Sequence, residues 1–153
     1  MKQKRILPGL LLLAIMAVAL VACGGSEVTP AAGVNLEEQT QEVPVEGGGS
    51  YTDVSVEGLA MLMEEEEFPL VNVHIPYEGE IEGTDLFIPY NEIEQNLEQL
   101  PADKDGRVVL YCRSGSMSAQ ASRTLVELGY TDVWNLDGGM IAWENSGRPL
   151  LRQ

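Results

Sequence analysis

The sequence predicts one α/β domain with a central parallel sheet flanked by helices, extending over residues 50–153. Short apolar runs typical of buried strands alternate here with segments whose apolar residues recur at helical spacing, and this alternation favours a parallel sheet. The region holds about a hundred residues, which is enough for one hydrophobic core but not for two. We therefore expect a single domain with a single functional site.

The first half of the domain combines two predicted helices with one strand. Ser55 has the position of an N-cap for a short helix that ends before Pro69. Residues 70–75 form an apolar run that predicts a buried strand, and residues 91–94 have the pattern of a capping box. The residues expected to face inward are Leu59, Ala60 and Met63 in the first helix and Ile93, Leu97 and Leu100 in the second.

The second half predicts a strand, a tight loop and a helix. Residues 107–111 are the strand, and residues 112–117 lead into the helix. Because ligands collect beyond the carboxyl ends of parallel strands, the loop that starts at Cys112 is the expected site. The remaining predicted elements are a helix end at Gly129, a strand over residues 133–136, and a short helix over residues 141–144 after Gly138 and Gly139.

The N-terminal segment has the pattern of a secretory signal peptide. Residues 1–5 are basic, and residues 6–22 form an almost unbroken apolar run that falls short of the roughly 20 residues a spanning helix needs. Residues 20–23 (Leu-Val-Ala-Cys) resemble the lipobox of bacterial lipoproteins. This resemblance implies that residues 1–22 are removed and that lipid on Cys23 anchors an extracytoplasmic protein to the membrane. The alternative is an ordinary signal peptide with an unrelated cysteine beside it.

Residues 23–49 are predicted to form a flexible tether that starts at the lipidated Cys23. They are rich in Gly, Glu, Gln, Pro and Thr and show no apolar periodicity. Residues 1–22 hold three of the nine basic residues and no acid, so the rest of the chain has 24 acidic and six basic side chains, a net charge of −18. This excess of acid argues against nucleic acid and anionic lipid surfaces as partners.

Cys112 is the only free thiol if Cys23 carries lipid, so no intramolecular disulfide is expected. Residues 112–118 (Cys-Arg-Ser-Gly-Ser-Met-Ser) join a strand to a helix N-terminus through small polar residues, whose backbone N–H groups point inward. Such donors stabilise a thiolate and equally a persulfide anion. The alternatives are an inert buried cysteine at position 112 and a surface charge of no consequence at Arg113.

Three segments resemble the rhodanese family: residues 108–118, residues 136–143 (Leu-Asp-Gly-Gly-Met-Ile-Ala-Trp) and residues 147–150 (Gly-Arg-Pro-Leu). The similarity extends over roughly residues 50–151. It implies a three-layer rhodanese-like fold and a sulfurtransferase that needs no metal or organic cofactor. The active cysteine of such a protein accepts a sulfane sulfur from thiosulfate or a persulfide donor and passes it to a thiol or to cyanide.

The resemblance also implies the residues of the site. Cys112 corresponds to the cysteine that carries the sulfur. The loop implied to bind the substrate anion consists of Arg113, Ser114, Gly115, Ser116 and Met117.

Three departures from the family pattern affect these expectations. Residues 72–74 (Asn-Val-His) stand where many members have Asp-x-Arg, and we expect His74 to be structural rather than a catalytic base. Met117 occupies a position that is often arginine, so thiosulfate should bind weakly, through backbone N–H groups and Arg113. Residues 75–89 are acidic and lack the usual small residues. Replacing Met117 by arginine would either restore a cation or, if Met117 packs inward, cost packing.

Other function classes are open at this point. A rhodanese-like module that binds sulfide, a persulfide or a partner protein without turnover is the main alternative, and the missing second arginine keeps it open. A phosphatase of the Cys-x5-Arg type would lack its clamp for phosphoryl oxygens, because the sixth residue after Cys112 is Ser118. The sequence has no Cys-x-x-Cys motif, which excludes a thioredoxin-like dithiol.

Overall fold

The computed structural model describes residues 35–152. The predicted signal peptide (residues 1–22), the predicted lipidation site Cys23 and the part of the predicted tether before residue 35 lie outside the described residues. Between residues 35 and 152, no helix is both long enough and apolar enough to span a membrane.

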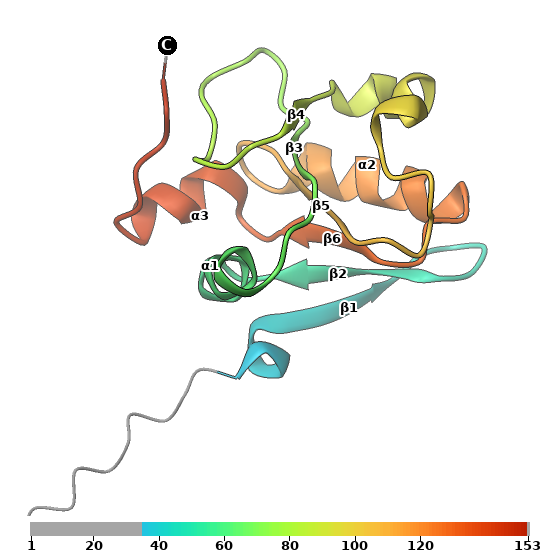
Figure 1. Ribbon diagram of the computed structural model, residues 1–153, viewed down its shortest axis with the longest axis horizontal. Coiled ribbons are helices and arrows are strands. Elements are labelled where there is room, and N and C mark those ends of the chain that lie inside the picture. Colours follow the sequence, from blue (N-terminus) through green and yellow to red (C-terminus); the bar gives the residue numbers. More distant parts are fainter. Residues whose placement is uncertain (1–34, 153) are drawn as a thin grey trace, which may run out of the picture. The chain divides into compact units, whose positions relative to one another are not determined.

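Six strands form one sheet at the centre of the fold: β1 (Thr40–Pro44), β2 (Ser50–Val54), β3 (Leu70–Asn72), β4 (Leu86–Phe87), β5 (Val108–Tyr111) and β6 (Val133–Leu136). Their order in the sheet is β1-β2-β6-β5-β3-β4 (Figure 1). β1 pairs with β2 antiparallel, and every other neighbouring pair is parallel. The predicted α/β fold with a central, mostly parallel sheet is therefore confirmed.

Helices cover both faces of the sheet and complete the three layers. They are α1 (Val56–Glu65), α2 (Ser116–Glu127) and α3 (Gly139–Asn145), together with the 3₁₀ helices η1 (Leu36–Gln39) and η2 (Tyr90–Gln99). One apolar core lies between the sheet and α2 with η2, and a second lies between the sheet and α1 with α3. Figure 1 shows the two groups of helices on different sides of the sheet. Because both faces are covered, all residues of β5 and β6 are buried.

Two helix ends form as the sequence predicts. The Ser55 side chain accepts a hydrogen bond from the backbone N–H of Gly58 at 3.1 Å, which satisfies one of the free donors at the start of α1. After the end of α2, Gly129 adopts a φ of 90°, and its N–H donates to the carbonyl of Val126 at 2.9 Å. Glycine is favoured at this place because it adopts a positive φ without steric strain.

The ordered domain begins earlier than predicted, because part of the predicted tether forms η1 and β1. All five residues of β1 pair with β2, and Val45 after it is buried in the core beside α2. The prediction of a flexible tether is therefore wrong for residues 36–45. β1 lies at the edge of the sheet, where polar residues and a proline are tolerated because only one side of the strand is paired. The composition of β1 is therefore similar to that of a flexible tether, and for this reason the sequence did not predict the strand.

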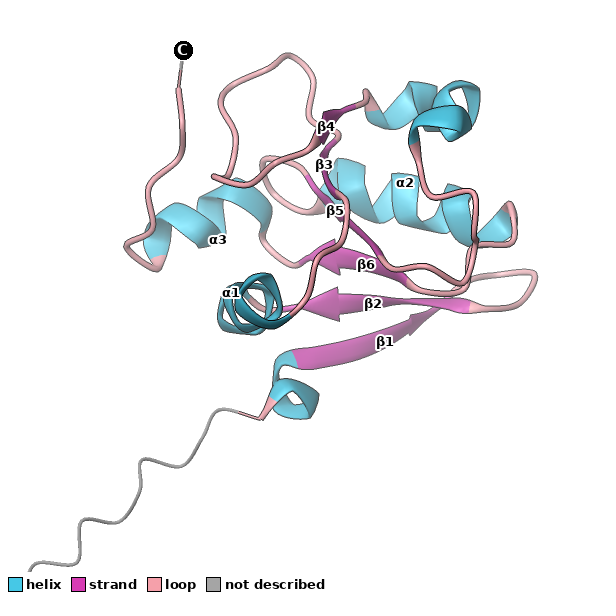
Figure 2. Ribbon diagram, in the orientation of Figure 1, coloured by secondary structure: helices cyan, strands magenta, loops and turns pink. Residues whose placement is uncertain are grey.

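The strand β3 is shorter than predicted. It ends at Asn72, whereas the apolar run predicted a strand up to residue 75. The side-chain oxygen of Asn72 accepts a hydrogen bond from the backbone N–H of His74 at 3.0 Å, and such a local bond competes with the sheet ladder and turns the chain. Figure 2 shows the segment between β3 and β4 as a long loop.

The predicted second helix exists, but it is the 3₁₀ helix η2 and it lacks the predicted capping box. It begins at Tyr90, directly after Pro89, and no side chain caps its start. Its backbone is non-helical at Asn96, whose side-chain amide donates to the carbonyl of Glu92 at 2.8 Å. Ile93 is buried as predicted, so the apolar periodicity identified the inward face correctly although the type of helix was wrong.

Candidate active site at the end of β5

Cys112 directly follows β5, the strand that lies between β3 and β6. The residue is only 1% exposed, and it is the free cysteine among the described residues. Because α2 begins at Ser116, residues 112–115 form the tight loop between strand and helix that the sequence predicts. The thiol therefore lies at the carboxyl edge of the parallel strands, where ligands usually bind.

Two hydrogen-bond donors point at the sulfur of Cys112. The backbone nitrogen of Gly115 lies 3.2 Å from Sγ, and Ser118 Oγ lies 3.4 Å from it. The Ser118 hydroxyl is also 3.1 Å from the carbonyl oxygen of Gly115, so its single hydrogen is shared between two acceptors. Both donors belong to the N-terminal end of α2, where the helix carries a partial positive charge. An anion at this sulfur would accept hydrogen bonds from both donors.

The start of α3, the helix that follows β6, donates backbone hydrogen bonds to the loop that begins at Cys112. The backbone N–H of Met140 donates to the carbonyl of Cys112 at 2.9 Å, and that of Ile141 donates to the carbonyl of Arg113 at 3.0 Å. Gly139 has a φ of 56°, and a Cβ at this position would overlap the carbonyl oxygen of Cys112. Glycine is therefore required for α3 to approach the loop. The Gly138-Gly139 pair was visible in the sequence, but only as the start of a helix.

The predicted loop residues differ in where their side chains lie. Arg113, Ser114 and Ser116 are exposed, and Gly115 is buried next to the sulfur. Met117 is partly buried and packs against the core on the α2 side of the sheet. Ser118 is buried, and its hydroxyl is hydrogen-bonded to the Cys112 sulfur. In the sequence, Ser118 belongs to the motif of residues 112–118 but not to the residues expected to bind substrate. The serines are therefore not equivalent: Ser114 lies in the loop before α2, and Ser116 and Ser118, two residues apart on α2, point about 200° apart around its axis.

An acidic residue from the segment between β3 and β4 pairs with the loop. Glu78 Oε2 lies 3.1 Å from Arg113 Nε, so the cation next to Cys112 is engaged by a carboxylate. The same oxygen lies 3.6 Å from Nε2 of His74, whose ring is buried and has no hydrogen-bond partner on either nitrogen. The sequence identified residues 75–89 as acidic but gave no pairing for Glu78, because the contact joins residues 35 positions apart.

The acidic segment is fixed to the strand that carries Cys112. The hydroxyl of Tyr111, the last residue of β5, accepts a hydrogen bond from the backbone N–H of Ile81 at 3.1 Å and lies 2.6 Å from Thr84 Oγ1. Burial is the main cause that raises the pKa of Tyr111 to about 12, so this hydroxyl keeps its proton. The side chain of Asn72 also donates to the carbonyl of Gly79 at 3.0 Å. Glu78 is thus part of a well-anchored segment.

A hollow of about 380 Å³ lies beside the loop. Its charged wall residues are two arginines, Arg113 and Arg152, and two glutamates, Glu78 and Glu144. Each arginine is paired with one of the glutamates, because Arg152 lies 2.7 Å from Glu144. Among residues 35–152, no three His, Cys, Asp or Glu side chains are grouped closely enough to hold a metal ion.

The fold and the site define an α/β protein with a buried cysteine at a strand end, whose sulfur accepts hydrogen bonds from the start of the following helix. The family model for the rhodanese-like domain matches residues 59–146, and this chain belongs to that family of sulfurtransferase-related domains. It is 40% identical over 93 residues to a protein named sulfurtransferase from Allochromatium vinosum, covering 59% of this chain and 84% of that relative. It is 34% identical over 70 residues to thiosulfate sulfurtransferase PspE from Escherichia coli, covering 44% of this chain and 67% of that relative.

Solved structures agree with the fold. A rhodanese-like domain protein from Staphylococcus aureus is 26% identical, with a TM-score of 0.54 over 66% of this chain and 97% of the other. A rhodanese-related protein from Thermoplasma volcanium has a TM-score of 0.56 at 23% identity, over 66% of this chain and 98% of the other, and shows the shared fold. The predicted rhodanese-like domain is therefore confirmed, and membership of a sulfurtransferase family implies a sulfur donor and a thiol acceptor.

Proposed function

We propose that this protein is a sulfurtransferase that carries sulfane sulfur as a persulfide on Cys112. The observation that carries the proposal is the pair of donors, Gly115 N–H and Ser118 Oγ–H, directed at a buried sulfur. The same donors would suit the thiolate of the resting protein and the persulfide of the loaded one, because both place an anion at the N-terminal end of α2. The family and its relatives named as sulfurtransferases support this assignment.

The transfer takes place in two displacement steps. In the first, the Cys112 thiolate attacks the outer sulfur of thiosulfate; a Cys112 S–S bond forms, the S–S bond of thiosulfate breaks, and sulfite leaves with its electron pair. In the second, an acceptor thiolate or cyanide attacks the outer sulfur of the persulfide, and the Cys112 thiolate is the leaving group. Charge is conserved in both steps, and no oxidant, reductant or cofactor is needed.

The proposal is tested by loading the purified protein and measuring its intact mass. After incubation with thiosulfate, the protein should gain the mass of one sulfur atom, and cyanide should remove this mass while thiocyanate forms. Cys112→Ser should neither gain the sulfur nor form thiocyanate above the uncatalysed rate. Sulfur transfer retained in Cys112→Ser would exclude Cys112 as the carrier.

The role of the hydrogen-bond donors around the Cys112 sulfur is tested separately with a pair of serine variants on α2. Ser118→Ala removes a donor to the sulfur and should lower kcat/KM up to about tenfold, less than a short charge-assisted hydrogen bond would contribute because the contact is long. Ser122→Ala is the matched control: Ser122 is also buried on α2, but its hydroxyl has no hydrogen-bond partner. Equal effects of the two substitutions would contradict the role given to Ser118.

A non-catalytic sulfur-binding or protein-binding module is the second candidate, because two observations favour it. Arg113 is engaged by Glu78, and Met117 packs into the core where a second cation would help to hold a dianion. A module of this kind would load sulfur at most once and show no turnover. Multiple turnovers with any sulfane donor would exclude it.

The predicted membrane anchor belongs to the same proposal. Leu20-Val-Ala-Cys23 after an apolar run supports lipidation of Cys23, which would hold the domain on the extracytoplasmic side of the cell membrane. Sulfur donors and thiol acceptors of that compartment would then be the substrates.

A further inference from the structure

The arginine next to Cys112 in the chain is engaged by a carboxylate. Arg113 follows Cys112 directly in the chain, and its Nε lies 3.1 Å from Glu78 Oε2. The second arginine in the wall of the adjacent hollow, Arg152, lies 2.7 Å from Glu144. Since these four residues are the charged ones in the wall, their charges sum to zero. A dianion that approaches along this wall gains no net attraction from it.

Glu78 is held in this position by the fold around it. Its neighbour Gly79 accepts a hydrogen bond from the buried Asn72 side chain, and the segment is anchored further along by Tyr111. On its inner side, Glu78 Oε2 faces the buried His74 ring at 3.6 Å. The rest of the wall is apolar and comes from Met140, Ile141 and Leu150. An uncharged or zwitterionic molecule fits such a wall better than a small dianion does.

We infer that Glu78 is a specificity-determining residue, which neutralises Arg113 and so directs the site away from thiosulfate and toward persulfides whose carrier molecule has no net charge. This inference rests on the proposed function, and it names the donor class of the same site. The transfer from such a donor is balanced: the Cys112 thiolate attacks the outer sulfur of a protonated persulfide, the donor S–S bond breaks, the carrier leaves as a thiolate, and the proton stays on the new Cys112 persulfide.

The first test measures how Cys112 discriminates between charged and uncharged reagents, which needs no sulfurtransferase activity. Iodoacetate and iodoacetamide alkylate thiols by the same displacement but differ by one negative charge. Glu78→Gln should raise the rate ratio of iodoacetate to iodoacetamide about threefold, which is the Coulomb effect of one charge if it acts over about 7 Å in a medium close to water. The gain should shrink as salt is added, because salt screens partly exposed charges.

The second test uses the donors themselves. Thiosulfate carries two charges, so Glu78→Gln should raise its kcat/KM about ninefold, the square of the effect on a singly charged reagent. With cysteine hydropersulfide as donor, the change should be threefold or less. The preference of the native protein for the hydropersulfide over thiosulfate should therefore fall at least about threefold in the variant.

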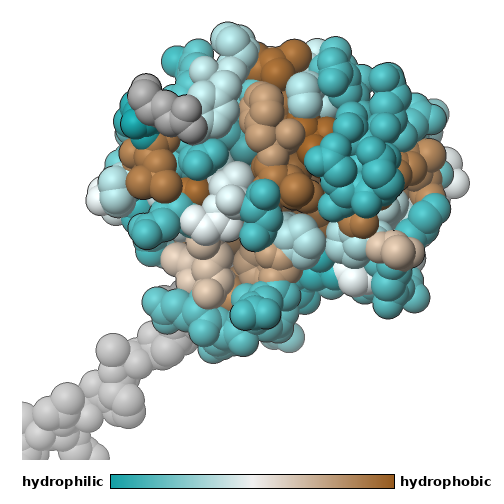
Figure 3. Space-filling view, turned by 45° about the horizontal axis from the view of Figure 1, so that its top comes forward, coloured by the Kyte–Doolittle hydropathy of each residue, from teal (hydrophilic) through white to brown (hydrophobic). Residues whose placement is uncertain are grey.

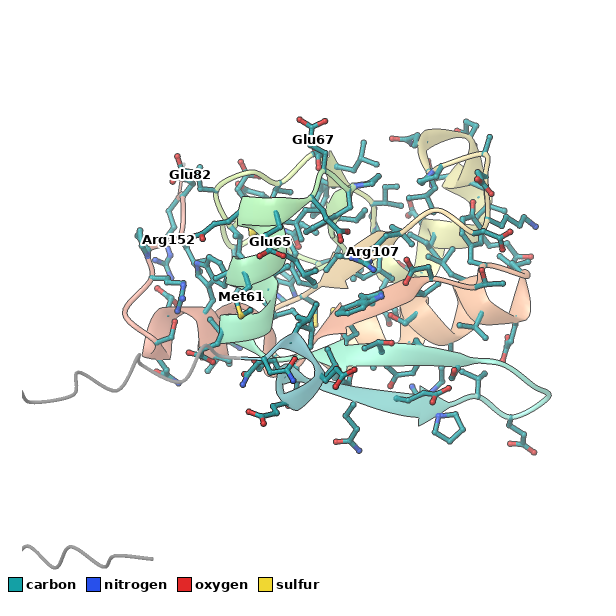
Figure 4. All side chains as sticks on the ribbon, turned by 60° about the horizontal axis from the view of Figure 1, so that its bottom comes forward. Met61, Glu65, Glu67, Glu82, Arg107 and Arg152 are labelled. Carbon is teal, nitrogen blue, oxygen red and sulfur yellow. The ribbon has the colours of Figure 1, made fainter. Side chains whose placement is uncertain are left out.

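A matched control and a double variant isolate the ion pair. Glu82→Gln removes the same charge from the same segment. Glu82 is exposed and takes part in none of the ion pairs among residues 35–152, and Figure 4 shows it at the edge of the molecule. This control should leave unchanged both the rate ratio of iodoacetate to iodoacetamide and the preference for the hydropersulfide over thiosulfate. Arg113→Gln should lower the thiosulfate rate, and the double variant Glu78→Gln/Arg113→Gln, which removes both charges of the pair, should transfer sulfur from thiosulfate at the rate of the native protein.

Each outcome separates this inference from the proposed function. An alkylation ratio that rises in Glu78→Gln but not in Glu82→Gln supports the inference, even if the protein transfers no sulfur, in which case only the proposed function fails. Sulfur transfer with an unchanged alkylation ratio leaves the proposed function intact and overturns the role of Glu78. Equal gains in Glu78→Gln and Glu82→Gln, a double variant Glu78→Gln/Arg113→Gln that exceeds the native rate as much as Glu78→Gln does, or failure of both reagents to alkylate the native thiol would also overturn it.

Discussion

At the scale of single residues, two neighbouring positions in the first turn of α2 have different roles: one contacts the sulfur and the other packs against the core. Ser118 points to the sulfur of Cys112, whereas Met117, its neighbour, packs against the core on the same side of the sheet. Successive residues of a helix point about 100° apart, so adjacent positions face different surroundings. The position that often carries a cation in related proteins is therefore occupied here by a side chain that stabilises the fold.

Met117→Arg is expected to destabilise the protein. Arginine would place a charge against apolar residues, and we expect the free energy of unfolding to fall by about 1–3 kcal/mol. Urea denaturation followed by circular dichroism measures this change, and Met117→Leu, which keeps the apolar contact, should cost less than about 1.5 kcal/mol. If Met117→Arg keeps its stability and gains kcat/KM for thiosulfate, the missing cation, and not packing, is the property that matters at this position.

At the scale of elements, the hairpin of β1 and β2 extends the sheet beyond the part that the sequence delimited. β1 covers one edge of the otherwise parallel sheet, and it leads to Val45, which reaches the core beside α2. The backbone N–H of Val45 also donates to the carbonyl of Gly49 at 3.0 Å, which closes the hairpin. Residues before the predicted boundary at residue 50 therefore contribute to stability.

Val45→Ala is expected to lower the free energy of unfolding by about 1–3 kcal/mol, because it removes two buried methyl groups and leaves a cavity. Chemical denaturation measures the difference. Glu46→Ala is the control, since Glu46 is the exposed neighbour of Val45 and should change stability by less than about 0.5 kcal/mol. Equal stability of Val45→Ala and the native protein would mean that this segment behaves as a tether after all.

At the scale of the whole molecule, negative charge dominates the protein. The chain has 24 acidic residues and a formal net charge of −15. Figure 3 shows one face of the protein as mostly hydrophilic, with hydrophobic residues gathered in small patches. Anionic headgroups would repel such a surface. Under the lipoprotein hypothesis, attachment to a membrane would therefore come from lipid on Cys23 rather than from this surface.

Cys23→Ser is expected to prevent lipidation and processing, so that the chain either remains uncleaved or is released from the membrane. Two acyl chains on one residue would anchor the native protein stably, and Cys23→Ser removes the site at which they would be attached. Membrane fractionation and the intact mass of the purified protein measure both effects. Normal cleavage with unchanged membrane association in Cys23→Ser would contradict the lipoprotein hypothesis.

The sequence by itself determined the features that depend on neighbouring residues or on regular spacing. Alternating apolar runs predicted the parallel sheet, Ser55 and Gly129 marked helix ends, and the segment from Val108 to Ser118 identified the strand, loop and helix around Cys112. Each of these signals acts within a few residues, because caps, periodicity and tight turns are local. The edge strand β1 was missed because its polar composition gives no such periodicity.

Only the tertiary structure decided the contacts that join distant parts of the chain. Glu78 pairs with Arg113, Tyr111 anchors the acidic segment, and Gly139 lets α3 approach the carbonyl of Cys112. These contacts depend on which strands become neighbours and on how closely helices approach the sheet, and one sequence contains no local pattern for either. For this reason the sequence located the candidate thiol, Cys112, whereas the pairing of the charges around it followed from the fold.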